Sequence, residues 1–265
     1  ITGDADLMEK TTETATDFFT ADGWTDDGTQ LVVDTTLNQF TWNGLRNAVD
    51  QGSYIDLTGA TISETAWRLD FDLQIDNVTE GTNNAYLYIG FSDDTLSDIN
   101  TASQDIIGLT TYMDNTSGAN DRFTAIASNE SSITSGGVDM TVAEPTVGKH
   151  FITIQRLSAT KARTAIYSDS ARTLLVDEHL TTITSALDNL RYLKITNLQV
   201  ASGAGSGVFD GNVTNIRFWN GITNPVTQET ATLTDDFTSD NGTAQGTVFS
   251  VTAGSINGAC DRQNS

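Results

Sequence analysis

Several residue types are scarce in this chain, and each scarcity narrows what the chain can be. Cys260 is the only cysteine among 265 residues, which excludes a disulfide within the chain. No run of about 18 apolar residues occurs, which excludes a membrane-spanning helix. Proline occurs at only two positions, whereas threonine is abundant. Since threonine is β-branched and suits a half-solvated pleated surface, the composition favours antiparallel sheet.

Basic residues are scarce relative to acidic ones. The chain has 13 Lys and Arg against 35 Asp and Glu, which gives a formal net charge of −22. Such a surface repels phosphate backbones and anionic lipid headgroups, so we expect neither nucleic acid nor a membrane surface as a partner. Cation binding and an acidic surface that is solvated without a specific ion site both remain open.

Alternating side chains are the clearest pattern that is present. Between residues 65 and 75, Trp, Leu, Phe, Leu and Ile follow one another at every second position, with Arg, Asp and Gln among the residues between them. This period of two predicts a strand buried on one side, because a helix would need spacings of three and four. The same alternation predicts further strands in 85–91, 106–113, 151–157, 164–167, 192–195 and 215–219.

Turn residues separate these segments. Gly, Asn, Asp and Ser gather at 114–121, 135–137 and 201–207. Many strands separated by turns, with no sustained helical spacing, predict an all-β fold of two packed antiparallel sheets. We expect 16–224 to form this domain, with linkers at 1–15 and 225–233.

The segment 16–33 recurs near the end of the chain. Aligned without a gap, residues 16–33 and 234–251 share nine of eighteen residues at an offset of 218. We therefore expect 234–265 to be the opening strands of a second repeat that stops early. About thirty residues cannot bury a core alone, so they should dock on their own domain or on a neighbouring copy. The residues expected to mediate this assembly are Phe237, Val248, Phe249 and Val251.

Three segments resemble concanavalin A-like, laminin-G-like domains. Residues 52–76 look like their opening strands, 148–177 like their central hairpin and 211–223 like their closing strand. The resemblance covers roughly 16–224 and implies a jelly-roll sandwich of two curved sheets, at the cell surface or outside the cell. Lectins, carbohydrate-binding modules, adhesion domains and some glycoside hydrolases share this fold, so the resemblance does not select one activity.

A glycoside hydrolase is the enzyme class to test. The hydrolases of this fold place carboxylates on one strand face in a Glu-x-Asp-x-x-Glu pattern, which serves the two-carboxylate mechanism. Here Asp70 and Asp72 share a strand face without a flanking Glu. We interpret them as a solvated pair balanced by Arg68 or Arg217, with a metal or catalytic pair as the alternative. With two histidines and no Gly-x-Ser-x-Gly elbow, nucleophilic catalysis also lacks support, so we expect no enzyme.

Calcium is the cofactor that the sequence leaves open, although none is required. Domains of the resembling family often hold Ca²⁺ in acidic rim loops, and carboxylates suit this hard cation. Two acidic clusters are candidates, although neither has a specific ligand spacing. They are Asp22, Asp26 and Asp27 in one loop, and Asp93, Asp94 and Asp98 in another.

Five aromatic residues project away from the apolar side of their strands. Exposed rings beside polar side chains suit stacking on sugars or contact with another subunit. The alternative is that loops or linkers cover the rings as a second small core. The candidate ligand-binding residues are the rings Tyr86, Tyr88, Tyr112, Tyr192 and Trp219, with Arg217, Asp70 and Asp72 beside them.

These observations rank three functions. The repeat and the linkers favour a non-catalytic structural or adhesive module that joins copies of itself into arrays or fibres through strand addition. The resemblance and the aromatic face favour a glycan-binding module as the alternative. A glycoside hydrolase comes third.

Overall fold

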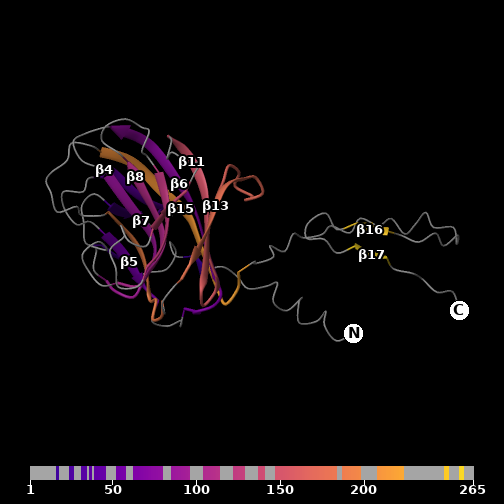
Figure 1. The fold of residues 1–265 in the computed structure, drawn as a ribbon. Helices are drawn as coiled ribbons and strands as arrows, with labels where there is room; N and C mark the ends of the chain where they lie inside the picture. The colour runs from indigo at the N-terminus through magenta and orange to yellow at the C-terminus, as the bar shows by residue number, and fades with distance from the viewer. Residues whose placement is uncertain are drawn as a thin grey trace, which may run out of the picture. The chain divides into compact units, whose positions relative to one another are not determined.

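The computed structural model divides the chain into two units, one of residues 14–223 and one of residues 1–13 with 224–265. In the second unit, β16 (Val248–Ser250) and β17 (Asn257–Ala259) pair antiparallel (Figure 1). The structure describes residues 16–17, 24–26, 31–34, 36–37, 39–45, 52–57, 62–79, 85–95, 104–113, 122–128, 137–140, 147–183, 187–197, 208–223, 248–250 and 257–259.

Eight strands of the first unit form the larger sheet. Their order is β13-β12-β11-β6-β15-β4-β3, and β1 pairs with another part of β15. The strands are β1 (Thr16–Asp17), β3 (Leu31–Asp34), β4 (Gln39–Leu45), β6 (Trp67–Thr79), β11 (Gly148–Ser158), β12 (Lys161–Tyr167), β13 (Leu175–Thr182) and β15 (Val208–Asn220).

Seven strands form the second sheet, in the order β10-β9-β8-β7-β14-β5-β2, and all pairs are antiparallel. The two sheets confirm the predicted all-β jelly-roll sandwich (Figure 1). Within the described segments, no helix has the length and apolar character needed to cross a membrane. The strands are β2 (Trp24–Asp26), β5 (Gly52–Asp56), β7 (Ala85–Ser92), β8 (Ile106–Met113), β9 (Arg122–Ser128), β10 (Gly137–Asp139) and β14 (Tyr192–Asn197).

The core lies between the sheets and begins with the alternation along β6. The predicted apolar residues of this strand are all completely buried, and Trp67 meets Phe91 of β7 edge to face, with ring centroids 4.9 Å apart. Burying each such side chain contributes about 1.5–3 kcal/mol to folding. The alternate residues of β6 therefore point away from the core. We call this side of the eight-stranded sheet its outer face.

The predicted hairpin near residue 160 is confirmed. In β11 and β12, Phe151 pairs with Tyr167 and Ile154 with Thr164. The loop that follows β12 is fixed by Asp169, whose carboxylate accepts hydrogen bonds from the backbone N–H groups of Thr173 and Leu174. This loop brings Arg172, at φ 55°, to the outer face of β6.

Candidate functional site

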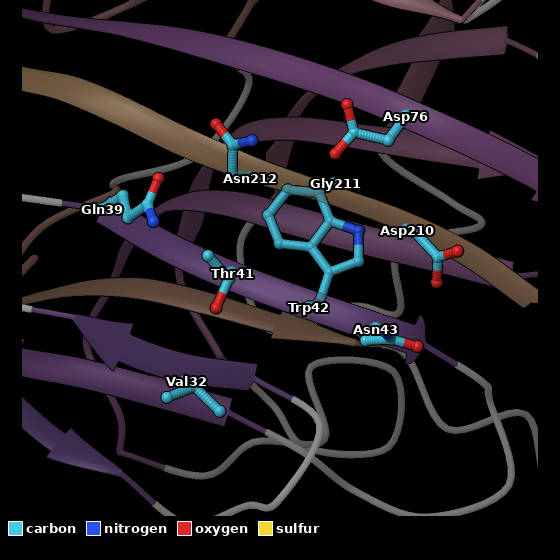
Figure 2. A pocket seen from close by; sticks show the side chains of 9 residues that line it. All are labelled: Val32, Gln39, Thr41, Trp42, Asn43, Asp76, Asp210, Gly211 and Asn212. Atoms are coloured by element: carbon cyan, nitrogen blue, oxygen red, sulfur yellow. The ribbon is translucent and has the colours of Figure 1, made fainter. Parts of the chain in front are cut away.

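A cavity of about 380 Å³ opens on the outer face of the eight-stranded sheet, where β3, β4, β15 and β6 lie side by side (Figure 2). We call it the pocket. Its lining residues are Val32, Gln39, Thr41, Trp42, Asn43, Asp76, Asp210, Gly211 and Asn212.

Strand register places the polar lining residues on one face. Val32 pairs with Thr41, and Thr41 pairs with Asn212 on its other side. Directly opposed residues in antiparallel strands point to the same face, so these three side chains form one row. Gln39 and Asn43 lie two residues to either side of Thr41 and share its face through the period of two.

Two β-bulges flank the pocket, one on each side of β15. Toward β6, Gly211 pairs with Ile75 but Asp210 pairs with Asn77, so Asp76 is the extra residue. Toward β4, the register also shifts next to Gly211, and Gly44 takes φ 67°, a conformation that glycine adopts without strain. Each bulge bends its strand and disrupts the hydrogen-bond ladder locally.

Asp210 ties the two bulges together. One of its carboxylate oxygens accepts a hydrogen bond from the backbone N–H of Gly44 at 2.5 Å. The other accepts from the side-chain amide of Asn77 at 3.4 Å. Asp210 is thus a structural carboxylate of the pocket wall.

Gly211 and Trp42 form an apolar part of the wall. The indole extends from β4 to Gly211 of β15 (Figure 2), and Trp42 is 3% exposed. A Cβ at Gly211 would collide with the carbonyl oxygen of Gln74 and lie 2.8 Å from the indole ring. Only glycine fits here, because the ring occupies the space of a side chain.

Five polar side chains of the pocket are uncommitted. Among the described residues, no hydrogen bond or ion pair engages the side chains of Gln39, Thr41, Asn43, Asp76 or Asn212. Amides offer donors and acceptors, and a carboxylate accepts. The described residues of the lining include no Lys, Arg or His. The arrangement therefore suits an uncharged ligand that is rich in hydroxyl groups and disfavours an anion.

A second polar region on the same face, which we call the ion-paired patch, consists of Arg68, Asp70, Asp72, Lys149 and Arg172. Arg68 contacts Asp70 at 2.7 Å, and Arg172 contacts Asp72 at 3.1 Å and Asp70 at 3.5 Å. Lys149 lies 3.6 Å from Asp72. Three cationic side chains thus surround the two carboxylates.

The ion-paired patch corrects one prediction and confirms another. Asp70 and Asp72 are 5% and 4% exposed, so their interpretation as a solvated pair is wrong. The physical reason is the loop carrying Arg172, which extends over β6. Arg68 does balance Asp70, whereas Arg217 is exposed and belongs to no ion pair of the described part.

The predicted aromatic surface is divided between the two sheets. The four tyrosines lie in β7, β8 and β14 of the seven-stranded sheet, whereas Trp219 lies in β15 of the other sheet. Tyr86 pairs with Tyr112 in register, and their side chains lie outside the described part. Their role in ligand binding stays a prediction.

The other three rings are not exposed, so the predicted exposure is wrong for them. Tyr88 is completely buried; its ring crosses Gly90 and Gly108, and its hydroxyl donates to the carbonyl oxygen of Phe91 at 2.8 Å. Burial, with the nearby Asp93 adding to it, holds the pKa of Tyr88 well above its ordinary value. Tyr192 and Trp219 are each 8% exposed. Arg191 covers Tyr192, and Arg68 covers Trp219.

The described residues do not assemble a calcium site. Asp93 and Asp94 lie together after β7, but one Asp93 oxygen already accepts the backbone N–H of Asp105. Burial raises the pKa of Asp93, and Asp94 raises it further. No group of three acidic, His or Cys side chains in the described part could hold a metal ion. Asp22, Asp27, Asp98 and the side chain of Asp26 lie outside the described residues.

The predicted assembly residues fall largely outside the described part. Val248 and Phe249 lie in β16, and their side chains are not described. Phe237 and Val251 lie outside the described residues. The second repeat over 234–265 and its assembly role therefore stay predictions.

The pocket residues were not among the sequence candidates. A usable signal was present in 39–45, where Gln39, Thr41 and Asn43 alternate with apolar residues. A second signal was Gly211 within a strand, because a glycine there marks a bulge or a close approach of another group.

No family model matches this chain, and no curated protein matches it. Among solved structures, the legume lectin-like domain from Entamoeba histolytica is 13% identical with a TM-score of 0.49, covering 75% of this chain and 90% of that one. The VIP36 exoplasmic/lumenal domain bound to Ca²⁺ and Man3GlcNAc is 9% identical, with a TM-score of 0.49 and coverages of 76% and 85%. A protein of unknown function from Shewanella oneidensis is 15% identical, with a TM-score of 0.45 and coverages of 82% and 93%. These similarities concern the arrangement of strands alone.

Proposed function

We propose that this chain is a non-catalytic carbohydrate-binding module whose pocket holds a neutral saccharide. The observation that carries the proposal is the set of five uncommitted polar side chains around the pocket. Gln39, Thr41 and Asn212 are half-buried, and such polar groups are usually satisfied within the protein. Asn43 and Asp76 are exposed beside them. Together they leave hydrogen-bonding groups around the cavity that a ligand can engage.

The chemistry of the lining fits a sugar better than other ligands. Hydroxyl groups donate and accept, so they match the amides of Gln39, Asn43 and Asn212 and the carboxylate of Asp76. Val32 adds apolar contact for the C–H groups of a ring. The described lining has two carboxylates and no cation, which disfavours phosphate, sulfate or carboxylate ligands.

The size of the pocket supports the same class of ligand. Sites for small molecules occupy about 300–1,000 Å³. A volume of about 380 Å³ lies near the lower end of that range. A single sugar ring, or the end of a longer glycan, is the expected occupant.

The proposed module binds its glycan without hydrolysing it. The two-carboxylate mechanism needs two available acidic groups. In the pocket Asp210 is engaged by Gly44 and Asn77, which leaves Asp76 alone. Outside it, Asp70 and Asp72 are held in ion pairs. We also propose an extracellular location, where the glycans of cell surfaces are accessible.

A glycan array of neutral and acidic saccharides tests this function, with each hit measured by isothermal titration calorimetry. We expect neutral saccharides among the hits and at least a tenfold loss of affinity for Asp76→Ala. Asp188→Asn is the control, since this half-exposed carboxylate precedes β14 and does not line the pocket. No neutral hit, or equal affinity of the two variants, would remove the support for the proposal.

A further inference from the structure

The row of side chains that crosses the pocket continues beyond it. Val32 of β3, Thr41 of β4 and Asn212 of β15 face one another in register. Asn212 pairs in turn with Gln74 of β6, and Gln74 pairs with Lys149 of β11. Directly opposed residues of antiparallel strands share a face, so all five side chains lie on the outer face. We call these five residues the five-strand row.

The five-strand row is longer than the pocket. Its strands are neighbours in the sheet, so it covers four strand spacings, or roughly 19 Å at about 4.8 Å each. Of its residues, only Val32, Thr41 and Asn212 line the pocket. A ligand that enters the pocket therefore has two more strands of the same face beside it, those carrying Gln74 and Lys149.

Both of these side chains have hydrogen-bonding groups to offer. The amide nitrogen of Gln74 donates to the carbonyl oxygen of Ile75 at 3.1 Å, while its amide oxygen accepts no hydrogen bond from the described residues. The ammonium group of Lys149 lies 3.6 Å from the carboxylate of Asp72, which is too far for a hydrogen bond. The Lys149 side chain is 44% exposed. An acceptor and several donors are thus available at this end of the row.

The loop after β12 leaves these two side chains accessible. Its Arg172 contacts Asp70, Asp72 and the carbonyl oxygen of Phe71, all on one side of Gln74 along β6. Gln74 is half-buried and Lys149 is exposed. The ion-paired patch therefore borders the five-strand row without closing it.

We propose that Gln74 and Lys149 form a second subsite, and that the ligand is a linear, neutral oligosaccharide lying across the strands along the five-strand row. This inference rests on the carbohydrate-binding function proposed above. Hydroxyl groups suit both side chains, because they accept from the ammonium group and donate to the amide oxygen. The nearby Asp72 offsets the charge of Lys149, so a neutral sugar fits this end as it fits the pocket.

The dependence of affinity on chain length tests the proposal. Isothermal titration calorimetry of the full chain would use linear β-linked gluco-, manno- and xylo-oligosaccharides, from the monosaccharide to the hexasaccharide. We expect the affinity to rise at least tenfold up to the tetrasaccharide, since each added hydrogen bond contributes about fivefold, and then to level off. Equal affinity of the monosaccharide and the longer chains overturns this inference and leaves the carbohydrate function standing. No binding at any length overturns both.

A matched pair of variants tests the far end of the row. Lys149→Met keeps an unbranched stem and removes the donors, so it should weaken tetrasaccharide binding about fivefold and leave monosaccharide binding unchanged. Lys161→Met is the control, because this exposed lysine begins β12 outside the row and its loss changes the net charge equally. Equal weakening by the two variants, or equal weakening for both ligands, contradicts the second subsite.

Nuclear magnetic resonance of the unaltered chain tests the path of the ligand without relying on a variant. The backbone amide signals of Thr41 and Asn212 should shift with the monosaccharide and with the tetrasaccharide. Those of Gln74 and Lys149 should shift with the tetrasaccharide alone. Signals of Gln74 and Lys149 that do not respond to any chain length would show that the ligand does not cross β6 and β11.

Discussion

The pocket and the ion-paired patch lie on the same outer face and both include residues of β6, yet their polar groups differ in whether the protein supplies their partners. In the patch, each carboxylate meets a guanidinium or ammonium group within 3.6 Å. In the pocket, five polar side chains are uncommitted. Polar residues on one face can therefore serve stability in one place and recognition a few residues away.

The backbone explains the difference. At the ion-paired patch, the loop after β12 brings Arg172 over the carboxylates, with its side chain also donating to the carbonyl oxygen of Phe71. At the pocket, two bulges disrupt the hydrogen-bond ladder locally, and the loop after β12 contributes no lining residue. Where the loop after β12 covers the outer face, the protein itself supplies partners for the carboxylates. Where the bulges lie and this loop does not reach, polar side chains stay available to a ligand.

The largest expected effect separates the two regions by stability. Asp72→Ala leaves Arg172 and Lys149 without their carboxylate and should lower the free energy of unfolding by about 3 kcal/mol, since breaking a buried ion pair is strongly destabilising. Asp76→Ala, four residues along the same strand, removes an uncommitted group and should change it by less than about 0.5 kcal/mol. Urea denaturation measures both, and equal losses would break the comparison.

The next effect tests the wall of the pocket. Gly211→Ala forces a Cβ against the Gln74 carbonyl and the Trp42 ring, and should destabilise the fold by about 1–3 kcal/mol as overpacking does. Displacement of the indole should also alter the near-ultraviolet circular dichroism. Unchanged stability together with an unchanged spectrum would show that the indole does not lie against Gly211.

A smaller effect concerns binding alone. Asn212→Ala removes one amide from the row formed with Thr41 and Val32, and should weaken saccharide binding by about fivefold, the equivalent of one hydrogen bond near 1 kcal/mol. The melting temperature should stay close to that of the parent. Titration calorimetry measures the affinity. A large loss of stability would instead indicate that Asn212 has a structural role, as the residues of the ion-paired patch do.

The smallest effect extends the comparison to the seven-stranded sheet. Because burial raises the pKa of Asp93 in the folded state, the folded protein binds this proton more tightly than the unfolded chain does. Stability from this group is therefore full below the unfolded pKa of about 3.9 and is lost as pH rises through the folded pKa. Asp93→Asn keeps an acceptor for the N–H of Asp105 and removes the titration.

The melting temperature of Asp93→Asn should accordingly rise relative to that of the parent as pH increases from about 4 to 7, and then level off. Differential scanning calorimetry across this range measures the difference. A constant difference, or one of opposite sign, would contradict the raised pKa.

Much of the fold could be predicted because alternation reports directly on burial toward the core. The apolar residues predicted for 65–75 include Trp67, Leu69 and Phe71, all fully buried, and the pairing of β11 with β12 follows from the same rule. The rule is silent on whether anything covers the opposite face. This is why Tyr88, Tyr192 and Trp219 could be assigned to the correct side of their strands but not to a buried environment.

The pocket could not be predicted because it depends on partners distant in sequence. Thr41 and Asn212 are neighbours only through the register of β4 and β15, and Asp76 becomes an extra residue only where β6 pairs with β15. Sequence spacing carries no information on either pairing. The sequence shows that these amide residues are present, but it does not show that they come together in the fold.

The pocket takes its lining from β3, β4, β15 and β6, four neighbouring strands of one sheet. These residues come together only when the strands are paired in the folded register, so the unfolded chain cannot bind the ligand in the same way. Ligand binding and folding are therefore linked: a saccharide at 100 times its dissociation constant should add about 2.7 kcal/mol to the free energy of unfolding.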